Sequence, residues 1–529
     1  MIKKVTKYSL LFLVLLVVVK GLFFSGNANL PVNDRAFSKA EPGFVWAQAG
    51  AQYTRGTIGA FFLGKHYRSV WAVPVKVPVI DINKLHGGLM PGKLGGGMQT
   101  ISLNLKDKQN NAYVLRSLNK DPIGVLPPFW RRTIVADFIR DQIAAANPYA
   151  ALVVSPLAGA AGIFHTNPRL YFVSATDKNM RPVVKPIGDK LFLFEEKFSH
   201  LPSAPHQFGQ ATAILNSVEM LDKRFRFNAH TIDQTLFLRC RLFDILIGDW
   251  DRHEGQWNWA AYTTLTGVLY KPIPKDRDQA FSKYQDGVIP WLLTRNFSLR
   301  KFGQFDNHPK DAVAYTINAS FLDERALNAL TLNSFRKAAR ELKAALTDEV
   351  IDQAVKRFPL PVYRLVGAET AQTLKSRRNE LLEIADAYYA ILAKHVVVAG
   401  SDEKERFEVV RLSGGKTKVR IYALTDENPT GRLLYQRLFT DKQTTEITLH
   451  GLGGEDRFTV EGKVATGSTI HIVGGRGSDY IQDNALVTKE TGKTIVYDTK
   501  KGNRIIWGEG TLDKTSTDLS VHHYDREGF

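Results

Sequence analysis

An internal repeat in the C-terminal part of the chain limits the folds that this part can adopt. ITLHGLGGEDRF (447–458) matches IHIVGGRGSDYI (470–481) at an offset of 23 residues. The match aligns Ile447 with Ile470, Gly454 with Gly477, and Asp456 with Asp479. A repeat of this length is typical of stacked β-turn units, or of a small sheet made of two equivalent hairpins.

The second copy of this repeat also fits the nonapeptide GGxGxDxUx, which binds Ca²⁺ when several copies follow one another. A calcium roll needs consecutive turns that share ligands, and a single copy does not supply them. We therefore favour structural turns over Ca²⁺ sites at Asp456 and Asp479.

The residue pattern changes after Val398, where helical periodicity gives way to short alternating strands and Gly/Asp/Asn turns. A chain of 529 residues has room for two or three domains, at roughly 150 residues each. We predict four segments: a leader at 1–29, an N-terminal extension at 30–80, an α+β domain at 81–398 and a β-rich domain at 399–529.

The N-terminus has the pattern of a secretory signal peptide. The cationic MIKKVTKYS precedes the apolar LLFLVLLVVV, and small residues follow in SGNANL. An uncleaved signal anchor is the alternative, although ten apolar residues are few for a span that needs about 20. We expect an exported protein of a Gram-negative bacterium, in the periplasm or associated with the outer membrane. Cys240 is the only cysteine, so no internal disulfide can form.

The charge balance is basic, with 70 Lys and Arg against 53 Asp and Glu, a net charge of +17. Such a surface favours anionic partners: nucleotides, phosphorylated substrates, lipopolysaccharide or membranes. The chain has no Arg-rich tail and no interleaved Lys/aromatic tract. A nucleic-acid partner is therefore not expected.

The α+β domain is predicted to begin with a glycine-rich hairpin. KLGGGMQ precedes an alternating run (101–105), a polar turn KDKQNN and a second strand AYVLRSL. An amphipathic helix is predicted over 131–153, and strands over RLYFVS and KLFLFEE. TIDQTLFLRCRLFDILI reads as an apolar helix with Thr231 as its N-cap. Helices follow from 333 to 397, one of them starting after Thr347 and a long one covering 368–396.

A charged loop, GDWDRHEGQW (248–257), directly follows that apolar helix. It has a structural interpretation, in which Asp and Arg pair beneath the indoles and hold the loop shut. The functional interpretation gains support from the next strand, which leads into PIPKDRDQAF. A helix-terminal loop with one Asp, followed by a hairpin with another, is the order found in kinase-like phosphotransferases. In that order Asp251 is the base, and Asp276 or Asp278 binds metal.

These two motifs resemble the atypical kinase branch that includes secretory-pathway, HipA-type and CotH kinases. The resemblance implies that Asp251 is the catalytic base and that His253 braces the loop. It also implies that Asp276 is the first-choice metal ligand and Asp278 the second. Gln256, five positions after the base, would help to hold the metal. The cofactors implied are ATP and Mg²⁺ or Mn²⁺.

The glycine-rich hairpin would then cover the phosphates through Gly95, Gly96 and Gly97. Arg116 stands where this family carries a phosphate-binding lysine, and Lys120 or Lys185 could supply the missing ammonium group. Arg pairs well with phosphate, but the departure also makes a nonfunctional nucleotide site credible. The acidic partner expected from the following helix is Asp137 or Asp141, and Glu195 and Glu196 are expected at the hinge.

A second resemblance covers the chain from about residue 50 to its end. GKHYRSVWAVPVKVPVID, GGGMQTISL, YVLRSLNKDP, GDWDRHEGQW and the GLGGEDRF repeat are similar to the central region of large Bacteroidetes envelope proteins. In those proteins the region precedes a BamA/TamA-like outer-membrane barrel. The resemblance implies a barrel partner, either within a longer product or supplied separately. This sequence has no DxH motif followed by GNHE, the pattern of a metal-dependent phosphoesterase.

Together these features predict an α+β fold, a two-lobed kinase-like domain followed by a small all-β domain. The first functional hypothesis is an exported phosphotransferase that uses ATP and a divalent metal. The alternative is an inactive kinase-like binding or assembly module beside an outer-membrane barrel, which contacts the barrel, a glycan or a lipid. A metal-dependent hydrolase ranks third, because no set of three or four ligands has a recognised spacing.

Overall fold

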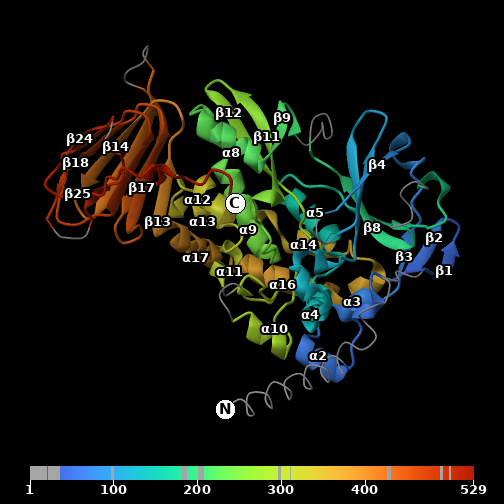
Figure 1. Ribbon diagram of the computed structural model, residues 1–529. Coiled ribbons are helices and arrows are strands. Elements are labelled where there is room, and N and C mark those ends of the chain that lie inside the picture. The colour runs from blue at the N-terminus through green and yellow to red at the C-terminus, as the bar shows by residue number, and fades with distance from the viewer. Residues whose placement is uncertain are drawn as a thin grey trace, which may run out of the picture.

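The computed structural model describes residues 21, 36–96, 100–180, 187–199, 208–295, 299–309, 311–425, 431–488, 492–499 and 502–528. Apart from Gly21, the predicted leader at 1–29 lies outside these residues, as do Gly97 and Lys185. Figure 1 shows two sheet-rich ends, with most of the helices between them.

The N-terminal end contains two antiparallel sheets. The smaller has three strands: β1 (Ala36–Glu41), β2 (Phe44–Ala47) and β3 (Val75–Pro78). The larger has the order β4-β5-β6-β8-β7 and consists of β4 (Met90–Gly95), β5 (Ser102–Lys106), β6 (Ala112–Ser117), β8 (Lys190–Glu196) and β7 (Arg169–Val173). The pairing of β5 with β6 around a turn at 107–111 confirms the predicted hairpin.

Two helices, not one, occupy the stretch predicted as a single helix over 131–153. α4 (Ile134–Asp141) continues into a short 3-10 turn, and α5 (Ala150–Ala160) begins after Asn147-Pro148. Their axes differ by 48°. Pro148 lacks an N–H and disfavours helix in the residue before it, which explains the break.

The N-terminal extension is built into the main core. α2 (Thr57–Leu63) and α3 (Arg68–Ala72) precede β3, and Tyr67, Val70 and Trp71 are buried with the central helices. The Tyr67 hydroxyl donates to the Phe281 carbonyl at 2.7 Å. Residues 36–78 therefore brace the segment that follows the predicted metal-binding turn.

The central part is mainly helical, with a small sheet of order β10-β12-β11-β9. Its helices are α8 (Ser217–Arg226), α9 (Gln234–Ile247), α10 (Val288–Leu293), α11 (Ala312–Thr316), α12 (Ser320–Ala326), α13 (Leu332–Ala345), α14 (Asp348–Val355), α15 (Leu360–Val362), α16 (Ala368–Asn379) and α17 (Leu381–Ala393). Its strands are β9 (Ala213–Asn216), β10 (His230–Ile232), β11 (Trp257–Thr264) and β12 (Gly267–Pro274).

Two predicted helix boundaries in this part were wrong. Thr231 does not cap α9, because it pairs with Leu269 in the parallel β10–β12 ladder, and the N-cap is Asp233, which accepts from the Leu236 N–H. The long helix expected after Ala368 breaks at Glu380 into α16 and α17. Thr347 caps α14 as predicted.

From β13 (His395–Ala399) onward the described chain is a stack of parallel coils fronted by antiparallel strands. One sheet has the order β13-β17-β20-β23-β25 and the other β16-β15-β14-β18-β21-β24, with β19 and β22 as a short third pair. The remaining bounds are β14 (Glu405–Leu412), β15 (Lys416–Ala423), β16 (Arg432–Thr440), β17 (Glu446–Gly453), β18 (Arg457–Glu461), β19 (Lys463–Val464), β20 (Thr469–Arg476), β21 (Tyr480–Asp483), β22 (Leu486–Val487), β23 (Thr494–Val496), β24 (Arg504–Ile506) and β25 (Thr511–Asp513).

The 23-residue repeat is one coil of this stack. Ile447 lies opposite Ile470 in the parallel β17–β20 ladder, so the stacked-unit interpretation is confirmed and the two-hairpin one is wrong. Side-chain oxygens link successive coils: Asp479 Oδ1 accepts from the Asp456 N–H at 2.9 Å, and Asn503 Oδ1 from the Asp479 N–H at 2.8 Å. Such bonds satisfy backbone donors at the bend of each coil.

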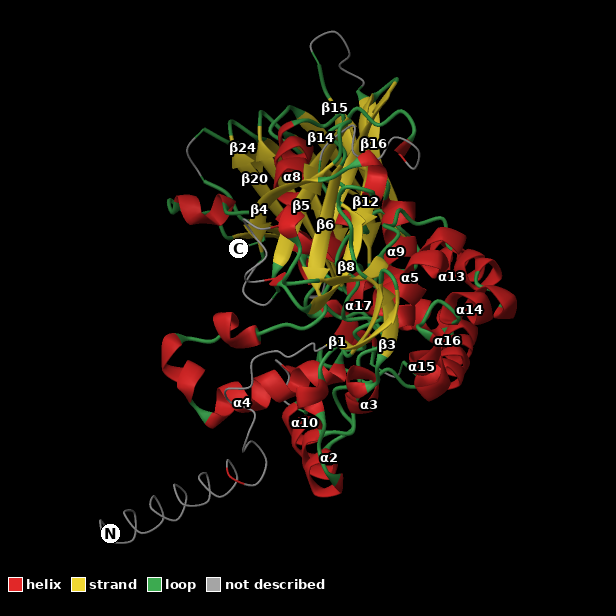
Figure 2. Cartoon of the chain, turned by 90° about the vertical axis from the view of Figure 1, so that its right-hand side faces the viewer, coloured by secondary structure: helices red, strands yellow, loops and turns green. Residues whose placement is uncertain are grey.

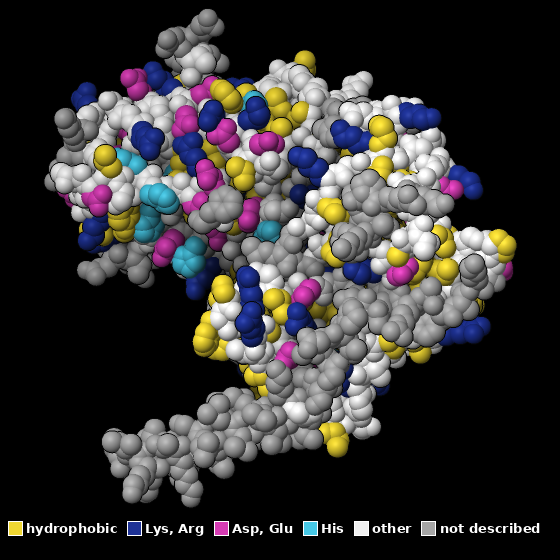
Figure 3. Space-filling model, turned by 45° about the vertical axis from the view of Figure 1, so that its right-hand side comes forward, with side chains coloured by type: hydrophobic (Ala, Val, Ile, Leu, Met, Phe, Trp, Pro, Cys, Tyr) yellow, Lys and Arg dark blue, Asp and Glu magenta, His cyan; other side chains and the backbone are white. Residues whose placement is uncertain are grey.

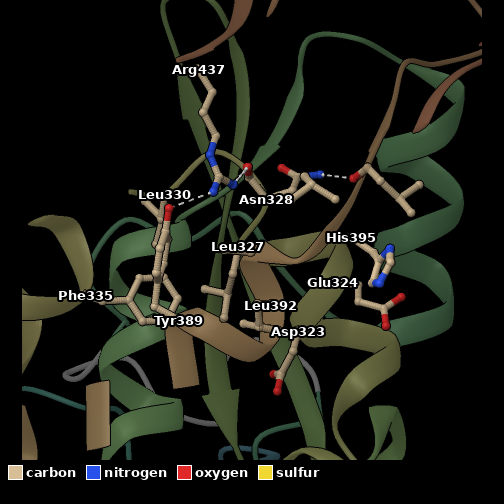
Figure 4. Close-up of a pocket in the computed structure, with 13 residues that line it drawn as sticks. Asp323, Glu324, Leu327, Asn328, Leu330, Phe335, Tyr389, Leu392, His395 and Arg437 are labelled. Carbon is tan, nitrogen blue, oxygen red and sulfur yellow. Dashed lines mark hydrogen bonds between the residues drawn. The ribbon is translucent and has the colours of Figure 1, made fainter. Parts of the chain in front are cut away.

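Asn328 joins the coil stack to the helices (Figure 4). Its carbonyl accepts from Arg437 Nη1 at 2.5 Å and from the Tyr435 hydroxyl at 2.9 Å. Its amide donates to the Val397 carbonyl at 3.0 Å, and Arg437 Nη2 also reaches the Tyr389 hydroxyl. The cavity beside this joint is only about 10 Å³, room for about one water.

Within the described part of the chain, no single helix is long and apolar enough to cross a membrane. The bent pair Ile134–Ala145 and Ala150–Ala160 meets the length and composition criteria only when taken together. Cys240 is buried in α9 as a free thiol, and burial raises its pKa to about 12.

Candidate active site

A single large cleft, of about 1420 Å³, brings together most of the residues selected from the sequence. It lies between the β4-β5-β6-β8-β7 sheet and the charged loop after α9. The selected residues that line it are Gly96, Arg116, Lys120, Asp251, His253, Gln256, Asp276 and Asp278. Gly95 ends β4 and is not among the lining residues, and Gly97 lies outside the described part.

The charged loop begins where α9 stops. Gly248 caps the helix in the left-handed conformation, with φ of 72°, which a glycine adopts without steric cost. The following residues then separate into a buried half and a half that faces the cleft. The buried half agrees with the structural interpretation, whereas the functional interpretation concerns the half that faces the cleft and stays a prediction.

Arg252 is the centre of the buried half. Its guanidinium donates to the Lys275 carbonyl at 2.7 Å and to the Gln256 carbonyl at 3.1 Å, and lies 4.6 Å from the Trp257 ring centroid. Its Nε is 3.2 Å from Asp244 Oδ2. These contacts tie the loop to the end of the β11–β12 hairpin.

Asp249 is also buried and holds the loop from the other side. Burial raises its pKa to about 8, against the opposing effect of Arg252, while the nearby Asp244 raises it further. Asp249 Oδ1 accepts from the Asp251 N–H at 3.2 Å. Asp249 thus fixes the backbone of the residue that turns toward the cleft.

Asp251 is the carboxylate that this backbone presents to the cleft, and its side chain is 28% exposed. Asn318 Nδ2 donates to Asp251 Oδ1 at 3.1 Å, and His253 Nε2 lies 4.0 Å from the same oxygen. His253 Nδ1 accepts from the Gly255 N–H at 3.1 Å, so the ring supports the turn that leads to Gln256.

Gln256 contributes an oxygen that has no hydrogen-bond partner among the residues that the structure describes. Its backbone is fixed by the bond from its N–H to the His253 carbonyl, whereas its side-chain Oε1 is buried and accepts no hydrogen bond. A buried acceptor of this kind costs free energy unless a ligand satisfies it. Because Gln256 lines the cleft, that oxygen is suited to a bound cation or donor.

Asp276 and Asp278 lie in a tight turn after β12. Asp276 has φ of 49°, a conformation that non-glycine residues adopt rarely and mostly at special sites. Asp276 Oδ1 is 2.5 Å from Arg116 Nη1, and Asp278 pairs with the Lys120 ammonium group. Each predicted metal ligand is therefore held by a cation from the sheet side of the cleft.

Arg116 bridges two carboxylates. Besides Asp276 it contacts Glu195, with 3.0 Å between Nε and Oε1. Burial alone would lower the pKa of Arg116, but Asp276, Glu195 and Asp278 together raise it. For the Glu195 carboxyl, burial raises the pKa and the neighbouring Arg116 cation lowers it, with burial the larger effect.

The acidic partner of Arg116 is therefore Glu195, and the expectation of Asp137 or Asp141 was wrong. β8 pairs directly with β6, which places Glu195 opposite Val114, two residue pairs along the ladder from Arg116. Asp141 is instead buried with Arg68 and Arg55, at 2.6 and 2.7 Å.

Three further residues of the site were not predicted from the sequence. Asn318 contacts Asp251 across 67 positions of sequence, and no local pattern indicates such a pair. Lys197 and Lys275 line the cleft, and burial lowers the pKa of each. Strand alternation on β8 could have placed Lys197 on the same face as Glu195.

The oxygen donors of the cleft suit magnesium in type. Mg²⁺ is usually bound by one or two carboxylates together with substrate phosphates. Asp276, Asp278 and the unpartnered Gln256 oxygen provide such donors. Within the described residues, no three His, Cys, Asp or Glu side chains are grouped so as to hold a metal ion.

Gly96 shapes the mouth of the cleft at the glycine-rich hairpin. Its φ is 130°, and a Cβ there would lie 1.9 Å from the Thr100 carbonyl oxygen. A side chain at this position would collide with the opposite arm of the turn. The turn therefore requires glycine at Gly96.

No protein-family model matches the chain, and no curated protein matches it. Among solved structures, the Helicobacter pylori proinflammatory kinase CtkA is 16% identical, with a TM-score of 0.33, over 59% of this chain and 98% of CtkA. HipA of a Shewanella oneidensis MR-1 toxin–antitoxin system, solved with HipB and operator DNA, is 13% identical, with a TM-score of 0.28, over 60% and 76%. Because both TM-scores lie below 0.5, these similarities do not by themselves establish the fold.

Proposed function

We propose that this chain is a metal-dependent phosphotransferase whose two kinase-like lobes enclose the cleft. One observation carries the proposal. Three separate segments line the same cleft: the charged loop with Asp251 and Gln256, the Asp276–Asp278 turn, and β6 with Arg116. A loop carboxylate, an amide oxygen, a pair of carboxylates and a cation are the groups that phosphoryl transfer from ATP requires.

Asp251 is the residue that acts on the acceptor. It takes the proton of the acceptor hydroxyl as the acceptor oxygen bonds to the γ-phosphorus. The bond between that phosphorus and the β,γ-bridging oxygen breaks, and ADP leaves with the electron pair. Asn318 and the Asp249-anchored backbone hold Asp251 in place for this step.

Arg116 and Lys120 would orient the phosphates on the sheet side of the cleft. A guanidinium pairs bidentately with phosphate oxygens, whereas an ammonium group acts as a point charge. Asp276, Asp278 and Gln256 would hold Mg²⁺ or Mn²⁺, which neutralises phosphate charge when bound. β6 and β8 present Val114 and Leu193 as an apolar surface suited to a flat base.

A second candidate function is a catalytically inactive kinase-like binding or assembly module of the bacterial envelope, associated with an outer-membrane barrel, which binds nucleotide without transfer or not at all. The ion pairs Arg116–Asp276 and Lys120–Asp278 favour it, because they already neutralise both predicted metal ligands. In either case we place the protein outside the cytoplasm, on the basis of its N-terminal sequence.

The test is thermal unfolding of the full chain with and without ATP and Mg²⁺ or Mn²⁺. A ligand at 100 times its Kd adds about 2.7 kcal/mol of stability, which raises the midpoint visibly. The variant Asp276→Ala/Asp278→Ala should lose a metal-dependent shift. Asp222→Ala, which removes one member of an exposed ion pair on α8, is the matched control.

The same samples are then given γ-labelled ATP, and released or transferred phosphate is counted. A metal-dependent shift with turnover supports the phosphotransferase. A shift without turnover, or no shift at millimolar nucleotide, overturns it in favour of the binding module.

A further inference from the structure

The cleft is larger than one nucleotide requires. Pockets that enclose a single small ligand have volumes of roughly 300–1,000 Å³, and this cleft has about 1420 Å³. The charged residues described above form only part of its lining. A second side of the lining consists of side chains from α4, α5 and α10 and from the turn before α4.

That second side is apolar, and we refer to it as the annex. The side chains that define it are Val125, Leu126, Val135, Phe138, Ile139 and Leu293. They come from the turn before α4, from α4 itself and from the end of α10. Ala151 of α5 also lines the cleft. An apolar space of this kind favours a hydrocarbon group over a polar one.

The annex opens on an exposed apolar surface, which we call the rim: Phe129, Trp130, Trp291 and Leu292. These four residues are 77%, 44%, 44% and 57% exposed. Val125 and Leu293 belong to the annex and are also exposed, and Leu293 directly follows Leu292 of the rim. Large exposed apolar patches mark interaction sites.

Neighbouring apolar residues extend the same end of the molecule. α10 packs against α2, which exposes Ile58 and Phe61. In Figures 1 and 2, α2, α4 and α10 lie together at the end of the molecule that faces away from the coil stack and the small β9–β12 sheet. Residues 20–56 separate α2 from the apolar N-terminal run at 10–19.

Basic side chains accompany the rim. Arg131 and Arg132 follow Trp130 and are exposed, and the Arg295 guanidinium lies 4.3 Å from the Trp291 ring centroid. Figure 3 shows Lys and Arg side chains beside hydrophobic ones on this lower lobe. Tryptophan and arginine at the edge of an apolar surface are typical of contact with a bilayer interface, and basic groups favour anionic headgroups.

We propose that the rim contacts an anionic bilayer and that the annex takes the hydrocarbon chain of a hydroxyl-bearing lipid, the acceptor. The acceptor class rests on the proposed function, because only a phosphotransferase would act on the hydroxyl beside Asp251. Chain binding in the annex does not depend on turnover. A protein partner, in contrast, would cover the rim but would not place a hydrocarbon chain in the annex.

The test uses the full chain bound to anionic phospholipid vesicles that contain a lipid with a photoreactive group in its acyl chain. After irradiation, labelled peptides are mapped by mass spectrometry. We expect peptides from 134–160 to be labelled at least about fivefold above those of the coil stack. Labelling needs no nucleotide, so an inactive phosphotransferase site does not affect it.

Two variants on one helix make the result specific. Ala151→Trp fills the annex and should reduce labelling of 134–160 severalfold. Ala160→Trp is the control, because Ala160 is exposed on the same helix and does not line the cleft. Ile139→Ser, which makes the annex more polar without added bulk, should act in the same direction if Ala151→Trp does not fold.

Labelling confined to the N-terminal peptide or to the rim would overturn the annex proposal. Labelling of 134–160 that neither Ala151→Trp nor Ile139→Ser reduces would overturn it as well. The ATP-dependent thermal shift, measured separately, reports whether the phosphotransferase proposal stands or fails independently.

Discussion

At the scale of single residues, neighbouring positions of the charged loop after α9 differ in role: some fix the backbone and others face the cleft. Asp249 and Arg252 are fully buried and make contacts that fix the backbone, whereas Asp251 and Gln256 reach the cleft. The four residues lie within nine positions of one another. Their different burial, rather than their residue types, assigns their roles.

Asp251→Asn tests the role of the loop carboxylate. The amide keeps the shape of the side chain but cannot take a proton, so turnover should fall by about 10²–10⁴-fold. Nucleotide-dependent stabilisation should be retained, because Asp251 is not among the metal or phosphate groups. Labelled-phosphate transfer and thermal unfolding on one preparation measure both properties.

Asn318→Ala provides the comparison for this variant. Asn318 positions Asp251 and need not touch the acceptor, so a smaller loss of turnover is expected, with nucleotide-dependent stabilisation again retained. Equal turnover in wild type and Asp251→Asn would remove Asp251 from the mechanism.

Arg116 offers a second test at this scale. Arg116→Met leaves Glu195 and Asp276 without their shared cation and removes a phosphate partner, so we expect the ATP-dependent shift to disappear. Arg116→Lys retains the charge but cannot span both carboxylates as the guanidinium does, and should keep part of the shift. A shift unchanged in both variants would show that Arg116 makes no contact with the nucleotide.

At the scale of elements, the sequence predicted the features that are determined by residues close to one another in the chain. The β5–β6 hairpin and the cap at Thr347 were predicted from the sequence, and stacking of the repeat was one of its two predicted alternatives. The break between α4 and α5 was missed although Pro148 signals it. The partners of Arg116 and Asp251 could not be predicted, because strand order and the position of Asn318 follow from long-range packing.

The coil stack contains acidic side chains at its bends, and they predict a pH dependence. Burial raises the pKa of Asp479 to about 6, from 3.8, while the bond from the Asp456 N–H opposes that rise. Because the folded-state pKa is raised, the stability that this group contributes is present below about pH 4 and is lost as the pH rises through about 6. The coil stack should therefore be less stable at pH 8 than at pH 5.

Asp479→Asn should relieve this effect. An asparagine oxygen can accept the Asp456 N–H, as Asn503 does from Asp479 in the next coil. At 1.36 kcal/mol per pKa unit, the gain at pH 8 is up to about 3 kcal/mol, and near pH 4 it should vanish. Denaturant midpoints at both pH values measure it, with Asp441→Asn, after β16, as control. A gain of equal size at both pH values would contradict the ionisation explanation.

At the scale of the whole molecule, one joint determines whether the helical part and the coil stack unfold together. The Asn328 carbonyl accepts from Arg437 and Tyr435, and Asn328 itself donates to the first strand of the stack. Arg437 is only 5% exposed, so its two bonds are shielded from water. The large cleft is lined by no described residue of the coil stack.

Arg437→Ala should separate the two parts thermally. The substitution leaves the Tyr389 hydroxyl without this donor and removes one of the two donors from the Asn328 carbonyl, at a cost of about 1–3 kcal/mol. Calorimetry of the wild-type chain should show coincident unfolding, and the variant should show two transitions.

ATP and Mg²⁺ should then raise only the transition of the helical part, because the coil stack contributes no residue to the cleft. Arg457→Ala, at an exposed position of β18, should leave the transitions coincident. A single transition in Arg437→Ala that ATP raises as a whole would mean that the surrounding contacts, such as Arg224 with the Ala399 carbonyl, are sufficient to couple the two parts.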